Sequence, residues 1–186
     1  MNSSNSYNLE ANSNPFELIA SDIKLIVMDI DGVLTDGGII INESGEQARI
    51  FNTKDGMAIR LLQLCKCSIA LVSGGNKNIA NKRAESLDIK YVFTGISNKL
   101  NSISTLQKEL RVTPEQTLFL GDDVNDLIAL PVVRMFLVPS DAHKSCIASA
   151  HWVGERSGGH GFVREFADLF LQARGLNPFQ PMATSN

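Results

Sequence analysis

The sequence has no long apolar run, and this absence limits the classes of protein to which the chain can belong. A helix that crosses a membrane needs about 18 or more consecutive apolar residues, and no such run occurs in the 186 residues. Residues 1–15 are rich in Asn and Ser and lack the basic and apolar segments of a secretory signal. We therefore expect no membrane span, and a disordered polar tail over residues 1–20.

Cysteine is scarce, and the number and spacing of the cysteines exclude two common roles. Because there are three, they cannot all pair with one another, and Cys65 and Cys67 lack the two-residue spacing of a zinc knuckle. Free thiols in a reducing compartment fit this pattern better. We therefore expect a cytoplasmic protein.

Neither sign of charge is in large excess. The chain has 17 basic and 20 acidic residues, a net charge of −3, and no long block of basic residues. A nucleic-acid-binding face needs a basic patch, so we expect no nucleic acid among the partners. The 44% of hydrophobic residues suffices for one folded domain, which we expect over residues 21–176, followed by a flexible C-terminal tail over 177–186.

Short apolar runs alternate with helical patterns along the chain. Strands are predicted at residues 25–28, 69–72, 91–93 and 117–120, and helices at 76–87, at 98–110 and from about residue 56. Strands separated by helices predict an α/β fold, with a three-layer, Rossmann-like parallel sheet flanked by helices. The helix from about residue 56 is expected to turn its apolar side chains inward, namely Met57, Ile59, Leu61, Leu62 and Leu64.

Residues 37–51 interrupt this alternation directly after the first strand. Two apolar stretches flank a polar, glycine-containing segment at residues 42–45, which predicts a β-hairpin. If this hairpin stood alone it would expose apolar area without benefit. The apolar residues concerned are Ile39, Ile41, Ile50 and Phe51.

Two carboxylates come directly after the first strand, where the chain reads Asp29-Ile30-Asp31. Ligands bind at the carboxyl ends of strands in an open α/β sheet, so two carboxylates one residue apart can share one cation and one substrate. Taken alone, the tripeptide is more typical of a solvated turn. Its interpretation therefore depends on motifs later in the chain.

Three later segments also place polar groups at strand ends or helix starts. Ser73, Gly74 and Gly75 follow a predicted strand, and their hydroxyl and amide groups suit phosphoryl oxygens. Lys99 begins a predicted helix, and the segment Gly-Asp-Asp-Val-Asn-Asp at residues 121–126 follows another strand. This order, Asp-x-Asp, Ser, Lys and Gly-Asp-x-x-x-Asp, resembles the haloacid dehalogenase superfamily of phosphohydrolases.

Longer stretches narrow the resemblance. They lie at residues 31–37, 51–57, 97–99, 121–123 and 158–165. These stretches are similar to the 3-deoxy-D-manno-octulosonate 8-phosphate (KDO 8-phosphate) phosphatase family, and the similarity covers about residues 22–175. The resemblance implies a Mg²⁺-dependent phosphomonoester hydrolase that releases the free sugar acid for cell-surface glycan synthesis.

The residues of these motifs suit the hydrolysis of a phosphate monoester. The anionic oxygens of a phosphate monoester repel nucleophiles, so cations and hydrogen-bond donors must accompany an attacking carboxylate. The resemblance implies that Asp29 is the nucleophile and that Asp31 protonates the leaving alcohol and then deprotonates water. Mg²⁺ is expected between the Asp29 carboxylate, the Asp31 backbone carbonyl and Asp122. Ser73 and Lys99 are expected to bind phosphoryl oxygens.

Other polar residues near these motifs have less definite roles. By resemblance, Asp126 orients Lys99 or a metal-bound water, and capping of the following helix is an equal alternative. Asp123, His160 and Arg164 are not assigned to one role.

The spacing of the motifs also bears on assembly. Members of this superfamily usually insert a cap domain over the site, but here the first gap holds only the hairpin and residues 73–99 hold only one helix, one strand and their loops. We therefore expect a capless enzyme that must exclude water in another way. The resembled family forms tetramers in which neighbouring subunits cover each other's clefts, which implies a homotetramer.

The prediction of the substrate depends on fewer residues than the prediction of the reaction. An acid sugar carries a carboxylate that requires a cationic partner, and Arg83 matches an arginine of the family; Ser73, Gly74 and Lys99 are expected around the phosphate. Where the family has Thr-Gly-Arg, however, this chain ends the tripeptide in Gly75. A nine-carbon, sialic-acid-type 9-phosphate is therefore an alternative substrate, and a non-catalytic assembly or regulatory protein is an alternative function.

Overall fold

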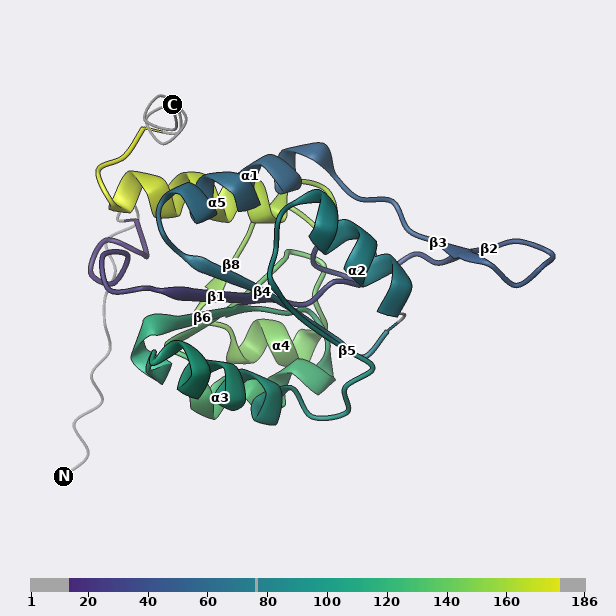
Figure 1. Cartoon of the computed structure of the whole chain (residues 1–186). Coiled ribbons are helices and arrows are strands. Elements are labelled where there is room, and N and C mark those ends of the chain that lie inside the picture. Colours follow the sequence, from purple (N-terminus) through teal and green to yellow (C-terminus); the bar gives the residue numbers. More distant parts are fainter. Residues whose placement is uncertain (1–13, 76, 178–186) are drawn as a thin grey trace.

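The computed structural model of the chain describes residues 14–75 and 77–177 (Figure 1). The tails expected over residues 1–20 and 177–186 therefore lie mostly outside the described residues. Within the described part of the chain, none of the helices is both long enough and apolar enough to cross a membrane.

A six-stranded, fully parallel sheet forms the middle layer, with the strand order β5-β4-β1-β6-β7-β8. The chain builds one side of the sheet from β1 outward and then returns to place β6 on the other side of β1. A parallel sheet binds ligands where its strand order reverses in this way. The strands are β1 (Leu25–Met28), β4 (Ser68–Ser73), β5 (Tyr91–Thr94), β6 (Thr117–Leu120), β7 (Met135–Val138) and β8 (Trp152–Val153).

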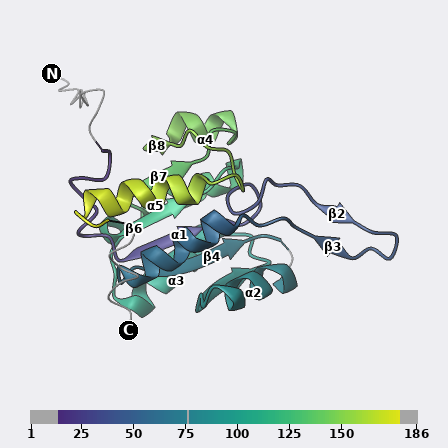
Figure 2. The same ribbon diagram turned by 90° about the horizontal axis from the view of Figure 1, so that it is seen from above.

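Helices cover both faces of this sheet (Figures 1 and 2). One face carries α1 (Thr53–Leu64), α2 (Lys77–Ser86) and α5 (Phe162–Ala173), and the other carries α3 (Lys99–Leu110), α4 (Lys144–Ser149) and the 3₁₀ segment η2 (Val124–Val132), while a short 3₁₀ turn, η1 (Pro114–Gln116), leads into β6. Side chains of β1 alternate between the two cores, because successive residues of a strand point to opposite faces. Ile26 and Met28 join the first core, and Leu25 and Val27 join the second.

This architecture confirms the predicted three-layer α/β fold, with differences in detail. The helix expected from about residue 56 begins at Thr53, where the Asn52 side chain accepts a hydrogen bond from the Lys54 amide. Met57 and Leu64 were expected to point inward, but their exposed fractions are 38% and 42%. At 100° per residue they lie on the side of α1 opposite Ile59, whose side of the helix faces the core.

The N-terminal segment also differs from expectation at residues 14–20. Phe16 is fully buried, with its ring centroid 5.4 Å from that of Phe166 and 5.6 Å from that of Trp152. The Asn14 side chain donates a hydrogen bond of 2.7 Å to the Leu169 carbonyl. A single aromatic residue in a polar segment thus attaches this part of the chain to α5.

The predicted hairpin projects from the body as a narrow arm (Figures 1 and 2). It consists of β2 (Ile40–Ile41) and β3 (Gln47–Ala48), which pair antiparallel around the turn that contains Gly45. Every residue from 36 to 50 is exposed except Arg49. The paired strands are much shorter than the apolar stretches suggested, and among residues 14–75 and 77–177 no second layer covers either face of the arm.

A buried carboxylate joins α1 to the start of α5. Asp55 is 1% exposed and accepts hydrogen bonds from the backbone amides of Gly161, at 3.2 Å, and Arg164, at 2.9 Å. Burial raises the pKa of Asp55, against the opposing effect of these donors. The amides at the first turn of α5 would lose their acceptors without this side chain.

We expect Asp55→Ala to lower the free energy of unfolding by about 2 kcal/mol or more, because it leaves buried amides unpaired. Asp168→Ala is the matched control: it removes a carboxylate on α5 that binds Arg164 at the surface, with 44% of the Asp168 side chain exposed. Asp168→Ala should lower the free energy of unfolding by less than about 1 kcal/mol. Urea denaturation of both variants measures the difference, and equal losses would contradict the structural role of Asp55.

Candidate active site

Three carboxylates meet at the carboxyl ends of β1 and β6. Ligand oxygens of Asp29, Asp122 and Asp126 all lie within 4.8 Å of one another. Asp29 directly follows β1, and its amide donates a hydrogen bond of 2.9 Å to the Leu120 carbonyl at the end of β6. The central position of β1 in the sheet therefore brings together acidic residues that are far apart in the sequence.

Lys99 supplies a cation in the middle of this cluster. It is the first residue of α3, whose start is capped by the Asn98 side chain. Its Nζ lies 2.5 Å from Asp29 Oδ2, and it also donates to Asp126 Oδ1, although the Lys99 side chain is only 3% exposed. Lys99 is thus held at the position where it can meet both the first carboxylate and an anionic ligand.

Asp126 organises the loop that carries Asp122. Its Oδ2 accepts hydrogen bonds from the amides of Asp122, at 2.9 Å, and Asp123, at 3.2 Å. Asp123 in turn caps η2 by accepting from the Val124 amide. Both of the uses expected for Asp126 therefore occur together, since one oxygen binds Lys99 and the other caps the following helical segment.

The crowding of carboxylates shifts their proton affinities. Burial, reinforced by the negative charges of Asp29 and Asp126, raises the pKa of Asp122 to about 8. Burial also raises the pKa of Asp29 to about 6, despite the opposing effect of Lys99. Burial alone would lower the pKa of Lys99, but the two neighbouring carboxylates outweigh it and raise that pKa. The site as it stands has an excess of negative charge that an additional cation would relieve.

A cavity of about 340 Å³ opens beside these groups. Ser73 lies at its wall with 4% of its surface exposed, and its Oγ accepts a hydrogen bond of 3.0 Å from the Gly75 amide. The cavity is lined by Asp29, Asp31, Gly37, Ser73, Gly74, Gly75, Asp122, Asp123 and Asn125. The structure thus brings together most of the residues that the sequence singled out.

Arg83 lies outside this cavity. Its guanidinium donates a hydrogen bond of 3.1 Å to the Asn52 carbonyl and sits 5.0 Å from the ring centroid of Phe51. It lines a separate groove at the base of the arm. Within this chain, therefore, the residue expected to bind the substrate carboxylate is not beside the groups expected to bind the phosphate.

His160 and Arg164 likewise point to other contacts. The Nδ1 atom of His160 lies 2.8 Å from the Gly158 carbonyl oxygen, and Arg164 Nε donates to both oxygens of Asp168 at 2.9 Å. These contacts are local to the loop at residues 157–161 and to the surface of α5.

Arg49 is a residue near the site that the sequence motifs did not reveal. Its Nε donates a hydrogen bond of 2.9 Å to Asp31 Oδ1, and only 4% of the Arg49 side chain is exposed. The signal that could have found it is a charged residue that interrupts the apolar sequence at the end of the hairpin. A contact between the arm and the second carboxylate of the Asp-x-Asp motif cannot be read from spacing alone.

Glycines allow the loops of the site to approach one another closely. A Cβ atom at Gly32, where φ is +91°, would lie 1.9 Å from Asp122 Oδ2, and one at Gly158 would lie 1.8 Å from the Gly32 carbonyl oxygen. Neither approach is compatible with a side chain. The loop at residues 157–161 therefore packs directly behind the loop that follows β1.

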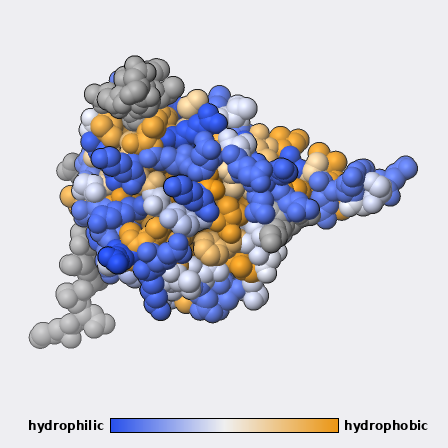
Figure 3. Space-filling view, viewed as in Figure 1, coloured by the Kyte–Doolittle hydropathy of each residue, from blue (hydrophilic) through white to orange (hydrophobic). Residues whose placement is uncertain are grey.

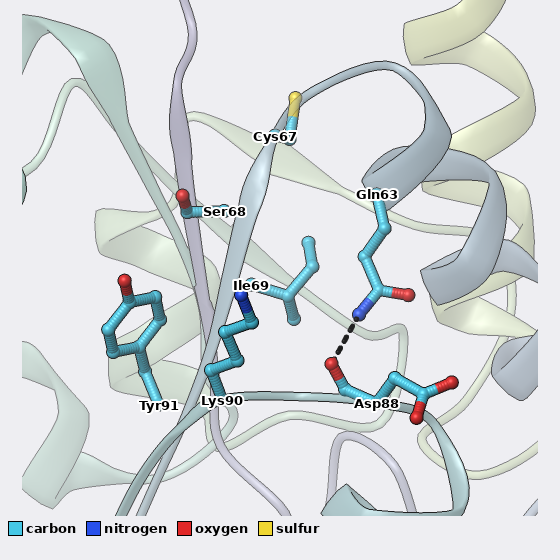
Figure 4. A pocket seen from close by; sticks show the side chains of 7 residues that line it. All are labelled: Gln63, Cys67, Ser68, Ile69, Asp88, Lys90 and Tyr91. Carbon is cyan, nitrogen blue, oxygen red and sulfur yellow. Dashed lines mark hydrogen bonds between the residues drawn. The ribbon is translucent and has the colours of Figure 1, made fainter.

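A second cavity, of about 380 Å³, lies at the opposite end of β4 (Figure 4). Gln63, Cys67 and Lys90 are among its lining residues, and Gln63 Nε2 donates to the Asp88 carbonyl at 3.3 Å. Burial raises the pKa of Cys67 to about 11, so this thiol is a poor nucleophile.

The cluster meets the requirements of a magnesium site. Carboxylate oxygens are the ligands that Mg²⁺ prefers, and Asp122 Oδ1 is buried without a hydrogen-bond partner. An orphaned, buried carboxylate oxygen beside two further carboxylates fits a divalent cation. Asp29 and Asp122 have the positions to bind it, and Asp126 is engaged by Lys99 and by backbone amides.

A carboxylate after β1, a hydroxyl at the end of β4, a buried lysine at a helix start and an acidic loop after β6 are the arrangement of a phosphohydrolase of the haloacid dehalogenase class. A hydrolase of this superfamily (subfamily III A) from Legionella pneumophila has the same fold, with a TM-score of 0.84 and 31% identity over 87% of this chain and 89% of that one. No family model matches the chain.

The curated 3-deoxy-D-manno-octulosonate 8-phosphate phosphatase KdsC of Escherichia coli strain K12 is 36% identical over 156 residues, which are 84% of this chain and 83% of the relative. The phosphatase of the same name from Moraxella catarrhalis, whose crystal structure contains a magnesium ion, a phosphate ion and KDO, superposes with a TM-score of 0.85 and 29% identity, covering 94% of this chain and 99% of that one. This chain belongs to the KDO 8-phosphate phosphatase family.

We expect Asp122→Asn to abolish stabilisation by Mg²⁺ while stabilising the metal-free protein. A carboxyl group whose pKa is raised by folding disfavours the folded state at neutral pH, so its replacement should raise the free energy of unfolding by at least about 1 kcal/mol without metal. In the wild type, Mg²⁺ should raise the melting temperature, because it binds only the folded chain.

Thermal denaturation with and without MgCl₂ measures both effects. Asp123→Asn is the control, because Asp123 is exposed and Asn also caps a helix; it should respond to Mg²⁺ like the wild type. A normal response to Mg²⁺ in Asp122→Asn would exclude Asp122 as a ligand.

Proposed function

We propose that this chain is a Mg²⁺-dependent phosphatase that hydrolyses KDO 8-phosphate to KDO and inorganic phosphate. The observation that carries the proposal is the contact of Asp29 with buried Lys99 at the wall of a cavity that also contains Ser73 and Asp122. The substrate follows from membership in the family and from the KDO, phosphate and magnesium bound to the Moraxella relative.

In the first step, an Asp29 oxygen attacks phosphorus, and the bond between phosphorus and the sugar oxygen breaks. Asp31 gives its proton to that oxygen, so the sugar leaves as an alcohol. The product on the protein is an aspartyl-phosphate at residue 29. When bound, Mg²⁺ would neutralise the phosphoryl oxygens and so reduce the repulsion that the nucleophile meets.

In the second step, Asp31 acts as a base. Its carboxylate accepts a proton from a water molecule as the water oxygen attacks phosphorus, and Asp29 is released together with inorganic phosphate. Lys99, the Ser73 hydroxyl and the Gly74 amide bind phosphoryl oxygens in both steps, and Asp126 holds Lys99 in place.

A nine-carbon acid sugar 9-phosphate is a second candidate substrate. Gly75 favours it, because this position lines the cavity without a side chain. An ideal Cβ there would lie 3.0 Å from Asp31 Oδ2, so even a small side chain would reduce the space beside the leaving group. Arg83 remains the proposed partner of the substrate carboxylate, approached from the base of the arm.

We expect the purified protein to release phosphate from KDO 8-phosphate in the presence of Mg²⁺ and to lose this activity in EDTA. Asp29→Asn should reduce turnover by at least about 10⁴-fold while the fold is retained, because the amide fills a similar volume but cannot attack phosphorus. A phosphate-release assay with KDO 8-phosphate, a sialic-acid-type 9-phosphate and a neutral hexose phosphate measures both.

The panel separates the alternatives. Faster phosphate release from the nine-carbon substrate than from KDO 8-phosphate would identify the nine-carbon compound as the natural substrate. Equal phosphate release by Asp29→Asn and wild type would exclude Asp29 as the nucleophile, and inactivity of the wild type on every substrate would favour the non-catalytic alternative.

Self-association completes the proposed function. The arm exposes Ile39, Ile40, Ile41 and Ile50 by 50% to 68%, and Figure 3 shows hydrophobic surface where the arm joins the body. Burying this area against other copies would offset the cost of exposing it and bring a neighbour over the uncapped cleft. We propose a homotetramer that acts in the cytoplasm, a compartment that suits the three free cysteines.

Replacing both Ile39 and Ile41 by Glu should convert the assembly to smaller species and lower kcat/KM for the acid sugar phosphate by about tenfold or more, since charges at a buried interface are strongly unfavourable. Activity on 4-nitrophenyl phosphate should decline less, because a small ligand needs less of the neighbour. Light scattering and kinetics test this. The control Leu18→Glu alters a residue that is 89% exposed on the body and should change neither quantity; a fully active wild-type monomer would refute the proposal.

A further inference from the structure

Arg49 connects the arm to the active site. It follows β3, and it is the one residue between positions 36 and 50 that is not exposed. Its guanidinium is held from two sides: Nε donates to Asp31 Oδ1 at 2.9 Å, and one terminal nitrogen donates to Gln47 Oε1 at 3.1 Å. A buried arginine with two acceptors has a fixed position, unlike the solvated side chains around it.

The two carboxylate oxygens of Asp31 have different surroundings. Oδ1 is occupied by the guanidinium of Arg49, which carries hydrogen-bond donors and no acceptor. Oδ2 lies 3.0 Å from the ideal Cβ position of Gly75, and Asp31 and Gly75 both line the 340 Å³ cavity. One oxygen is therefore turned toward the arm, and the other is left facing the substrate.

We propose that Arg49 is a positioning residue that orients the Asp31 carboxyl group so that Oδ2 carries out proton transfer. This inference rests on the proposed function, because it assigns the proton to a single oxygen of the proposed acid. In the first step the proton moves from Oδ2 to the sugar oxygen as its bond to phosphorus breaks. In the second step Oδ2 takes the proton of the attacking water.

The same contact makes the arm part of the catalytic apparatus. The paired strands are only two residues long, so they hold the base of the arm weakly by themselves. The ion pair with Asp31 ties this base to the loop after β1, and displacement of the arm would move the acid out of alignment. Positional errors of about 1 Å are sufficient to slow a catalysed step substantially.

The kinetic test compares leaving groups. An alkoxide needs a proton in order to leave and a nitrophenolate does not, so a misplaced acid should slow only the reaction with the alkoxide leaving group. Arg49→Ala should therefore lower kcat/KM by about 10- to 100-fold for KDO 8-phosphate and by less than about threefold for 4-nitrophenyl phosphate. In an Asp31→Asn background, adding Arg49→Ala should cause no further loss, because both changes act through the same carboxyl group. Equal losses on both substrates, or losses that add, would overturn the proposal.

The control is Lys108→Ala. Lys108 is an exposed lysine in the last turn of α3, and it lines neither the groove of Arg49 nor the 340 Å³ cavity. Its removal should leave both kcat/KM values within about twofold of the wild type, which separates the specific contact from a general loss of positive charge.

A structural measurement tests the inference without any turnover. In crystal structures of the wild type and of Arg49→Ala without substrate, Oδ2 of Asp31 should face Gly75 in the former, and the carboxyl group should rotate away in the latter. An unchanged Asp31 in the variant would overturn the positioning role. If the wild type acts on 4-nitrophenyl phosphate and on another sugar phosphate but not on KDO 8-phosphate, the substrate proposal fails, and that sugar phosphate takes the place of KDO 8-phosphate in the Arg49 test. If it hydrolyses nothing, the proposed function fails and the crystal structures decide the role of Arg49.

Discussion

The ammonium group of Lys99, buried between Asp29 and Asp126, is the interaction on which the rest of the site depends. Three carboxylates close together in a poorly solvated place repel one another, and each is costly to bury as an ion. Lys99 offsets part of that cost, and the backbone amides that donate hydrogen bonds to Asp126 offset another part. Burial, reinforced by the remaining negative charge, raises the pKa of Asp122, so the folded chain holds a carboxyl group that favours either a proton or a divalent cation.

The sheet makes this concentration of charge possible. β1 lies between β4 and β6, so the segments after all three strands converge on one point. They contribute the Asp29 carboxylate, the Ser73 hydroxyl and the acidic loop that carries Asp122. Behind them, Gly158 allows the loop at residues 157–161 to touch the backbone after β1. That loop is held by Asp55, so a carboxylate on α1 supports the active site without facing it.

Sequence patterns predicted strands β1, β4, β5 and β6, helices α1, α2 and α3, and a common site for Asp29, Lys99 and Asp122, because short apolar runs and strand-end motifs are local signals. They did not predict β7, β8, α4 or α5. They did not predict contacts that depend on where two distant segments meet. Phe16 belongs to a polar segment and becomes core only because α5 and β8 form an aromatic pocket. Arg49 meets Asp31 only because the second strand of the arm returns to the loop after β1. The two-residue strand β8 is too short to have a periodic pattern of its own. Met57 shows the converse: it is an apolar residue on a helix, but the direction of the core is set by the neighbours of α1.

The strand order also has a consequence for biosynthesis. β1 pairs with β4 on one side, but its other edge stays unpaired until β6, which begins at Thr117, has been synthesised. A chain emerging from the ribosome therefore exposes one edge of its most apolar strand until β6 has been made, and exposed edges of this kind promote wrong pairing. Asp29 likewise lacks two members of its cluster until residue 126 has been synthesised. The nascent protein thus cannot bind its metal at this site or act on a substrate before most of it has been translated, and the step that closes the sheet is the same step that completes the site.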